Sequence, residues 1–389
     1  MNQIKQGYKQ TKVGIIPEDW EVVKLGKVTK INPNNKNLPE NFIYIDLESV
    51  VKGKLLKQNF ISKYEAPSRA QRVLKKNDIL FQMVRPYQMN NLFFEFDGDY
   101  VASTGYAQIR TNQSDKYIFQ YIHLKRFVDK VLEKCTGSNY PAINSSDLSD
   151  ILIILPPLKE QEKIAEILTT WDEAITKQTE LLRAKELLKI ALMQKLLSGE
   201  VRFDGFSDKW EEVKIKDIFE ITRGYVLAVT EMSQEQTAEY KYPVYSSQTK
   251  NNGLTGYYKD YLFENCITWT TDGANAGDVN LRKGKFYCTN VCGVLKSDKG
   301  YANQCIAEIL NLVTKNYVSY VGNPKLMNNT MGGIKIKIPK SLPEQQKIAE
   351  VLSLADDEIN LLKNELEELK LQKKALMQKL LTGEVRVKV

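Results

Sequence analysis

A chain of 389 residues and 44.6 kDa is too long for one ordinary hydrophobic core, so its length predicts two or three domains. The hydrophobic fraction of 42% and the charged fraction of 26% are typical of a soluble globular protein, and no run approaches the roughly 18 uninterrupted apolar residues of a membrane span. The formal net charge of +7 is a modest excess that excludes a histone-like tail, and the start, "MNQIKQGYKQTKVG", lacks the apolar core of a secretory signal. We therefore expect a cytoplasmic protein.

The first region, residues 1–155, predicts an α/β domain. Runs rich in β-branched and aromatic residues at 41–50, 78–84, 91–96 and 106–111 predict strands, and residues 115–134 predict an amphipathic helix. The only histidine of the chain, His123, falls in this predicted helix, where a packed structural role is favoured over catalysis. Two polar loops, "VRPYQMNN" and "CTGSNYPAINSSD", interrupt the pattern.

The next segment, residues 156–200, predicts one long amphipathic helix. Prolines precede it in "PPLKEQ", Glu160 falls in its first turn, and Gly199 follows its last apolar turn. Steps of four and three residues predict an apolar seam, interrupted by Gln178, Lys185 and Lys189. The seam residues are Ile164, Leu168, Trp171, Ile175, Leu182, Leu192 and Leu196.

The second variable region, residues 201–338, predicts another α/β domain. Its start, "GFSDKWEEVKIKDIFEI", resembles "IPEDWEVVKLGKVTKI" near the start of the chain. Strands are predicted at 242–247, 265–271, 278–296 and 333–338, and a helix at 302–313. Of five cysteines, only Cys288 and Cys292 are close in sequence, and their spacing predicts one face of one strand. An odd number of cysteines and no second pair favour buried thiols over disulfides or a metal site.

The last segment, residues 339–389, repeats the first helix. Aligning Glu344 with Glu160 matches 43 positions without a gap, and 23 of the pairs are identical. "SLPEQQ" predicts Ser341 as the N-cap of a capping box with Glu344, and Gly383 ends the helix. Its predicted seam, which only Lys373 interrupts, comprises Ile348, Leu352, Ile359, Leu362, Leu366, Leu369, Leu376 and Leu380.

Two such helices in one chain favour an intramolecular antiparallel pair, because each has an apolar stripe that needs a partner. The alternatives are that each helix packs on its own domain or drives homodimerisation. Each predicted helix of about 38 residues has a length of roughly 57 Å.

The charge excess lies mainly in the first region, where residues 1–154 hold 22 basic and 16 acidic side chains. The loops of both regions are rich in Asn, Gln, Ser, Thr, Arg, Lys and Tyr, which can bind base edges and phosphates, although ordinary turns favour several of these residues too. Candidate DNA contacts in the first region are Arg85, Tyr87, Gln88, Asn90, Asn91, Thr104, Tyr106, Ser138 and Asn139. In the second region they are Ser247, Gln248, Lys250, Asn251, Asn252, Thr271, Asp272, Asn275, Lys325 and Asn328.

Motifs of catalysis on nucleic acid are missing from the sequence. The only Pro-Pro, in "LPPLK", lacks the polar and aromatic neighbours of an amino-methyltransferase loop. No G-x-x-x-x-G-K-[ST] is present to bind a triphosphate. The sequence therefore favours a binding module without catalytic residues, without a metal site and without a cofactor of its own.

The whole chain resembles the specificity subunits of type I restriction-modification systems. The residues that carry this resemblance are "GIIPEDWEVVKLGKV", "LPPLKEQEKIAEILTTWDEAI", "LMQKLLSGEVRF", "SLPEQQKIAEVLSLADDEI" and "LMQKLLTGEVRV". The polar middle of the first helix departs from a regular seam and leaves the pairing there open.

The resemblance implies two α/β (α+β) recognition domains, at 1–155 and 201–338, and two helices, at 156–200 and 339–389, that form an intramolecular antiparallel coiled coil with pseudo-two-fold symmetry. It implies that each domain binds half of a split double-stranded DNA target and that the helices set the spacer. The implied partners are two modification subunits, which bring S-adenosylmethionine, and restriction subunits, which use ATP and Mg²⁺. The alternatives are a self-contained enzyme acting on nucleic acid and a coiled-coil scaffold that binds no DNA.

Overall fold

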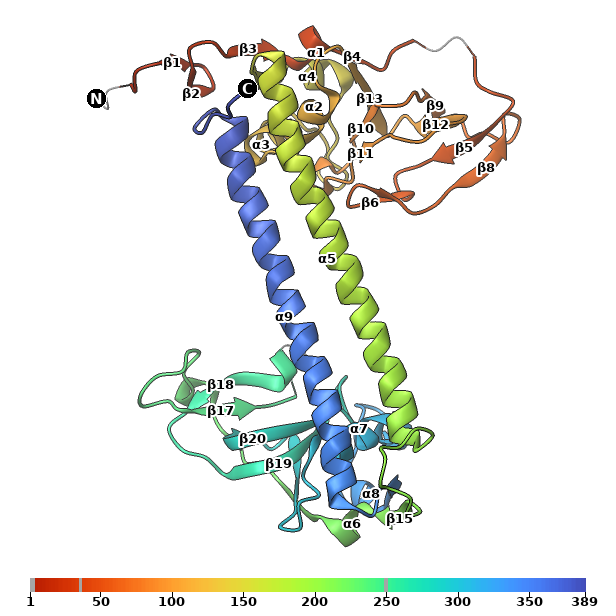
Figure 1. Cartoon of the computed structure of the whole chain (residues 1–389), viewed down its shortest axis with the longest axis vertical. Helices are drawn as coiled ribbons and strands as arrows, with labels where there is room; N and C mark the ends of the chain where they lie inside the picture. The colour runs from red at the N-terminus through yellow and green to blue at the C-terminus, as the bar shows by residue number, and fades with distance from the viewer. Residues whose placement is uncertain (1–3, 35–36, 248–250) are drawn as a thin grey trace. The chain divides into compact units, whose positions relative to one another are not determined.

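The computed structural model describes residues 4–34, 37–247 and 251–389. The chain divides into two compact units (Figure 1). Unit 1 comprises residues 1–179 together with 365–389, and unit 2 comprises residues 180–364. Both long helices contribute one part to each unit, so unit 1 needs the last residues of the chain to complete it.

Unit 1 contains two four-stranded sheets, in the orders β11-β10-β13-β4 and β8-β5-β12-β9. All neighbours in them are antiparallel except β5 and β12. Three antiparallel pairs, β1–β2, β3–β14 and β6–β7, accompany them. The strands are β1 (Tyr8–Thr11), β2 (Gly14–Pro17), β3 (Glu21–Lys24), β4 (Thr29–Ile31), β5 (Asn41–Ile45), β6 (Val50–Val51), β7 (Lys54–Leu55), β8 (Asn59–Ser62), β9 (Ala70–Val73), β10 (Ile79–Gln82), β11 (Leu92–Phe93), β12 (Tyr100–Ser103), β13 (Tyr106–Thr111) and β14 (Leu152–Leu155).

The helical part of unit 1 corrects one prediction. The single helix expected over 115–134 is two helices, because Leu124 has an extended backbone and starts a new helix as its N-cap. His123 lies at this break, where its Nδ1 is 2.7 Å from the carbonyl oxygen of Phe119 and its Nε2 is 3.2 Å from Nδ2 of Asn91. His123 is therefore half-buried and in contact at both ring nitrogens, which agrees with the predicted structural role. The short helices are α1 (Leu25–Val28), α2 (Asp115–Tyr121), α3 (Lys125–Glu133), α4 (Ser145–Ser149) and the 3-10 turn η1 (Pro86–Gln88).

Unit 2 is built on a six-stranded sheet in the order β16-β21-β19-β20-β17-β18, beside the antiparallel pair β15–β22. Its strands are β15 (Glu211–Lys214), β16 (Glu220–Arg223), β17 (Tyr242–Tyr245), β18 (Leu254–Tyr258), β19 (Phe263–Thr270), β20 (Val279–Cys288), β21 (Cys292–Lys296) and β22 (Lys335–Ile338). Its helices are α6 (Ile215–Ile218), α7 (Gln304–Val313), α8 (Asn328–Gly333) and the 3-10 turns η2 (Val229–Glu231), η3 (Asn251–Gly253) and η4 (Thr314–Tyr317).

The expectation that Cys288 and Cys292 share one strand is wrong. Cys288 ends β20 and Cys292 begins β21, so the two residues flank a turn. Both are buried free thiols, as is expected of structural cysteines. Burial raises the pKa of Cys292 to about 11.

The two units share one substructure. In unit 1, β3 pairs with β14 and is followed directly by α1 and β4. In unit 2, β15 pairs with β22 and is followed by α6 and β16. The similar segments around Trp20 and Trp210 therefore form the same substructure in both units, which explains why the sequence echoes itself there.

Both predicted long helices are confirmed: α5 (Leu158–Ser198) and α9 (Leu342–Leu381). Ser341 precedes α9, and its side-chain oxygen lies 3.5 Å from the backbone nitrogen of Glu344. The second half of the expected capping box is missing, because the Glu344 carboxylate binds Arg202 instead. Gly199 and Gly383 both have positive φ, 75° and 77°, as the left-handed position after a helix requires.

Within each unit, the segments of α5 and α9 run antiparallel. In unit 1, α5 residues Asp172 and Gln178 contact α9 residues Lys373 and Glu365. In unit 2, Lys185 pairs with Glu358 and Lys189 pairs with Asp356, so residue numbers again rise along α5 as they fall along α9. The predicted apolar seam residues are buried or half-buried throughout. The polar residues that interrupt the seam therefore pair with polar or charged residues of the other helix.

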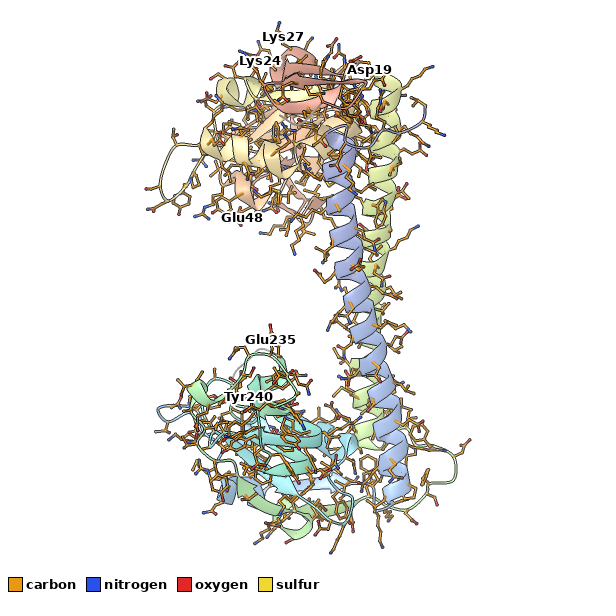
Figure 2. The ribbon with its side chains drawn as sticks, turned by 90° about the vertical axis from the view of Figure 1, so that its left-hand side faces the viewer. Asp19, Lys24, Lys27, Glu48, Glu235 and Tyr240 are labelled. Atoms are coloured by element: carbon orange, nitrogen blue, oxygen red, sulfur yellow. The ribbon has the colours of Figure 1, made fainter. Side chains whose placement is uncertain are left out.

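The ends of the helices make matching contacts in the two units. In unit 1, Arg386 binds the buried carboxylate of Glu160 through Nε at 3.1 Å and through a terminal nitrogen at 2.7 Å. In unit 2, Arg202 binds the buried carboxylate of Glu344 through two nitrogens at 2.7 Å. Arg386 also donates to Asp19, which is labelled in Figure 2. The end of each helix is therefore anchored to the start of the other.

Candidate nucleic-acid interface

A polar loop follows β10 in unit 1 and is held in shape by its own amides. The Asn91 side chain accepts a hydrogen bond from the backbone of Gln82 at 2.8 Å, and the Gln82 side chain accepts one from the backbone of Asn90 at 3.1 Å. Gln82 also donates to Gln88 at 2.9 Å. This network fixes the turn Pro86–Gln88 relative to the strand, so the loop has a defined shape before any ligand binds.

This loop meets a second polar loop at what we name junction 1, formed by residues 83–85 and 136–143. Thr136 and Ala142 exchange two backbone hydrogen bonds of 2.9 Å, which closes the second loop. Two bonds join the loops: the backbone nitrogen of Arg85 donates to the Pro141 carbonyl at 2.7 Å, and that of Ile143 donates to the Met83 carbonyl at 3.1 Å.

Unit 2 contains the same arrangement, which we name junction 2, formed by residues 271–273 and 319–326. Ser319 and Lys325 exchange backbone hydrogen bonds of 2.8 and 2.9 Å. The nitrogen of Gly273 donates to the Pro324 carbonyl at 3.0 Å, and that of Leu326 donates to the Thr271 carbonyl at 2.9 Å. Two regions with little sequence in common therefore build the same loop junction from backbone hydrogen bonds.

The side chains on the two junctions differ. In junction 1, the Arg85 guanidinium lies over the ring of Tyr140, with its carbon 4.3 Å from the ring centre. In junction 2, the cation is Lys325, whose amine is 3.7 Å from the carboxylate of Asp272. The same backbone thus presents a tyrosine-stacked guanidinium in one unit and an acid-paired amine in the other.

Next to junction 2, a buried arginine shapes the loop that contains the turn Asn251–Gly253. Arg282 stacks on Tyr245 at 3.7 Å, donates to Thr268 at 3.0 Å and donates to the backbone oxygen of Asn252 at 2.7 Å. Burial lowers the pKa of this guanidinium. It also lines a polar pocket of about 150 Å³ together with Asn275. Sequence reasoning missed Arg282, because nothing in a β-strand pattern separates a buried arginine from an exposed one.

The predicted contact residues divide by exposure. Asn91, Tyr106 and Thr271 are buried, with exposed fractions of 1%, 0% and 2%, so their side chains do not reach the surface of the loops. Gln248 and Lys250 lie outside the described residues. The others are exposed or half-buried: Arg85, Tyr87, Gln88, Asn90, Thr104, Ser138 and Asn139 in unit 1, and Ser247, Asn251, Asn252, Asp272, Asn275, Lys325 and Asn328 in unit 2.

Five of the exposed or half-buried candidates lie in the junctions themselves: Arg85, Ser138, Asn139, Asp272 and Lys325. Ser138 and Asn139 lie in the closed loop of junction 1, beside the residue that stacks on Arg85. In unit 2, Asn275 donates to the Ser247 carbonyl at 3.3 Å and so joins the loops that follow β17 and β19. Thr104 belongs to a different turn, where its backbone nitrogen binds the carbonyl of Arg69, and is not part of either junction.

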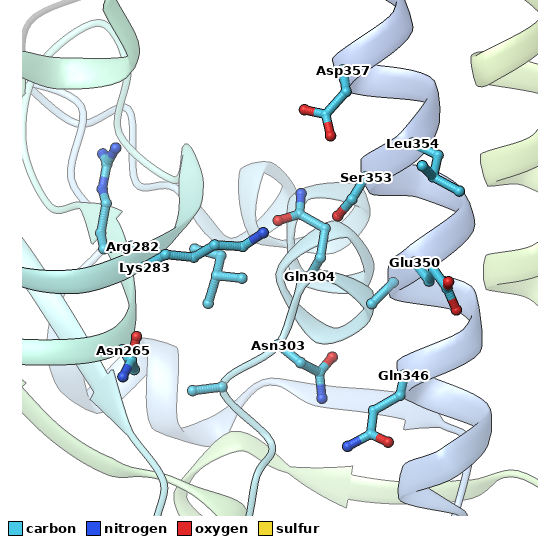
Figure 3. A pocket seen from close by; sticks show the side chains of 13 residues that line it. Asn265, Arg282, Lys283, Asn303, Gln304, Gln346, Glu350, Ser353, Leu354 and Asp357 are labelled. Carbon is cyan, nitrogen blue, oxygen red and sulfur yellow. The ribbon is translucent and has the colours of Figure 1, made fainter.

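A larger pocket of about 500 Å³ lies in unit 2 between α9 and the residues around β20 (Figure 3). Glu350 and Asp357 of α9 line one side, and Arg282 and Lys283 line the other. Because two acidic side chains balance the two basic ones, the pocket has no basic excess that would favour a polyanion. We therefore leave it out of the candidate interface.

No cluster of metal-ligating side chains is present in the described part of the chain. Among the same residues, no helix is both long and apolar enough to pass through a bilayer.

Comparison with known proteins identifies a family. The model of the type I restriction modification DNA specificity domain matches residues 17–184 and again residues 207–371. A protein of Mycoplasma pneumoniae named as a type I specificity subunit is 34% identical over 209 residues, which is 53% of this chain and 83% of its own length. The MjaVIII specificity subunit of Methanocaldococcus jannaschii is 26% identical over 420 residues, or 96% of this chain and 94% of its own.

The fold is similar to that of a solved structure. The crystal structure of the type I restriction-modification S subunit from M. genitalium matches with a TM-score of 0.67 at 17% identity, covering 93% of this chain and 96% of that one. The two-domain architecture with two repeated specificity domains is therefore shared.

Proposed function

The chain belongs to the type I restriction-modification DNA specificity family, and we propose that it reads a split, asymmetric DNA target with one half-site for each unit. Members of this family are specificity subunits, which are not themselves enzymes. The observation that carries the proposal is the repeated junction. One backbone arrangement recurs in both units, but its cation is Arg85 in one and Lys325 in the other. Two junctions with the same backbone hydrogen bonds but different side chains are suited to two half-sites of different sequence.

We propose that the exposed loop residues at the two junctions make the DNA contacts. Asparagine, glutamine and arginine side chains can each bind a base edge through two hydrogen bonds, and lysine, serine and threonine bind phosphates. The basic excess of the first region supports phosphate binding there. The buried residues Asn91, Tyr106 and Thr271 take a supporting role in this proposal.

We further propose that α5 and α9 form one antiparallel coiled coil that spaces the two recognition units. Helices of 41 and 40 residues have a length of roughly 60 Å at 1.5 Å per residue. Two half-sites on one face of B-DNA lie about 34 Å apart for each helical turn between their centres. Helices of this length are sufficient to hold two units at such a spacing. The ion pairs of the seam support the proposed register.

The chemistry belongs to other subunits in this proposal. We propose that two modification subunits, which bind S-adenosylmethionine, dock on this chain and methylate adenine, and that restriction subunits using ATP and Mg²⁺ join them. A cytoplasmic location agrees with this role.

The test is adenine methylation mapped across a genome, in cells that carry the partner modification gene with or without this chain. We expect a bipartite, asymmetric motif only when the chain is present. Methyl transfer by the purified chain alone would favour a self-contained enzyme. A complex that assembles but protects no split site in footprinting would favour a scaffold instead.

A further inference from the structure

Junction 1 places an arginine where the backbone favours glycine. Arg85 has φ of 53° and ψ of 54°, which is the left-handed region. Side chains with a Cβ adopt this conformation at an energetic cost, and a residue that keeps it is a candidate for a functional role.

The corresponding position in junction 2 is a glycine. Gly273 also has a positive φ, 93°, and makes the same backbone hydrogen bond to a proline carbonyl. The backbone arrangement of the junction therefore forms with glycine at this position, and its hydrogen bonds require no side chain there. Arg85 must be explained by what its guanidinium does.

The surroundings of Arg85 prepare the guanidinium for a planar ligand. It stacks on the Tyr140 ring, which is 65% exposed and therefore lies at the surface. Its Nε is buried and has no hydrogen-bond partner among the described residues. Among the described residues, no hydrogen bond or ion pair involves its two terminal nitrogens, which are therefore available to an external pair of acceptors. Stacking on an aromatic ring fixes the plane of a guanidinium and so reduces the entropy lost on binding.

We propose that Arg85 is the specificity-determining residue of the first recognition unit and binds the O6 and N7 acceptors of a guanine end-on. The inference rests on the proposed function. A guanine edge is favoured over a phosphate because a left-handed, tyrosine-stacked arginine fixes both position and plane, whereas a phosphate is bound equally well by flexible surface lysines.

The experiment uses the full chain assembled with its modification partner. Arg85→Gly introduces the residue that junction 2 has at the equivalent position. Arg85→Lys keeps the positive charge but removes the planar guanidinium. The matched control is Met89→Gly, because Met89 has a φ of 51° in the same loop and is not among the proposed DNA contacts. Each variant is measured by thermal unfolding and by methylation of a target library randomised at both half-sites.

We expect Arg85→Gly to unfold at the same temperature as the wild type or higher, because the strain is removed. It should lose selectivity at one guanine of one half-site by roughly 5- to 150-fold and leave the other half-site unchanged. Arg85→Lys should lose the same selectivity, and Met89→Gly should keep it.

Three results would overturn the inference. One is an unchanged motif in Arg85→Gly, and another is a uniform loss of activity with no change of motif, which indicates a phosphate contact. The third is a large fall in unfolding temperature that Arg85→Lys restores, which indicates a structural role. The proposed function fails separately, if the wild-type complex yields no bipartite motif at all.

Discussion

The ion pair between Arg386 and Glu160 joins the end of α9 to the start of α5 in unit 1 and gives a quantitative prediction. The Glu160 side chain is 1% exposed and accepts two hydrogen bonds from Arg386 and one of 3.0 Å from Trp20. Replacing Arg386 with methionine leaves a buried carboxylate with one donor. Two hydrogen bonds to charged groups contribute about 3–6 kcal/mol in total. Since the arginine side chain is 40% exposed, water can replace part of this, and we expect a loss of about 2–4 kcal/mol.

Unit 2 supplies the matched comparison. Arg202 makes the same two bonds to Glu344 but is only 20% exposed. The tryptophan that corresponds to Trp20 does not contribute there, since Nε1 of Trp210 is buried and has no partner within residues 4–34, 37–247 and 251–389. Arg202→Met should therefore cost at least as much as Arg386→Met. This order follows from solvent exposure and from the missing third donor.

The assay is urea unfolding followed by circular dichroism, combined with hydrogen exchange at residues 377–383 and 193–199. Arg386→Met should speed hydrogen exchange at residues 377–383, and Arg202→Met should speed it at residues 193–199. A double-mutant cycle with Glu160→Gln should give a coupling energy of about 1–3 kcal/mol. If Arg386→Met costs less than about 1 kcal/mol, or costs the same in the Glu160→Gln background, the pair does not anchor the helix end, and this reasoning is refuted.

Three further predictions concern other parts of the chain. Lys189→Asp places like charges opposite Asp356 and should lower the unfolding temperature, whereas the double exchange with Asp356→Lys should restore most of it; no restoration would mean that the two groups do not meet. Burial lowers the pKa of His123, so the folded state resists protonation, and stability should fall as pH drops below about 6.5, the usual value for an unfolded histidine; the same fall in His123→Gln would exclude it as the cause. Cys292, whose pKa burial raises to about 11, should react with iodoacetamide at pH 8 only after denaturation, and rapid labelling of the native chain by mass spectrometry would contradict its burial.

The long helices were predictable because their signal is periodic and local. The apolar positions recur with the spacing of a helix face, and prolines and glycines mark the ends. The break of the helix near His123 was not predictable in this way. The amphipathic pattern continues across it, whereas the backbone of Leu124 is extended and His123, beside it, contacts Asn91 in a distant loop.

The candidate interface was predictable only as a composition of loops. Its geometry depends on backbone hydrogen bonds between segments far apart in sequence, as between Arg85 and Pro141, and such bonds leave no mark on residue type. The equivalence of Arg85 and Gly273 could not be seen either, because the two loops share almost no sequence. Solvent exposure was a further limit on the prediction. The sequence does not show whether a polar residue such as Asn91 faces solvent or is buried in a hydrogen-bond network.

The pattern of identity within the repeat can be explained by the contacts. Lys189 and Lys373 are equivalent positions, as are Asp172 and Asp356, and the structure pairs each lysine with the aspartate of the other copy, at 2.6 and 2.5 Å. The middle of each helix diverges except at these residues and a few apolar positions. Because every such contact joins the two copies, a change in one copy alters a residue whose partner lies in the other. Identity between the copies is therefore expected at the pairing residues.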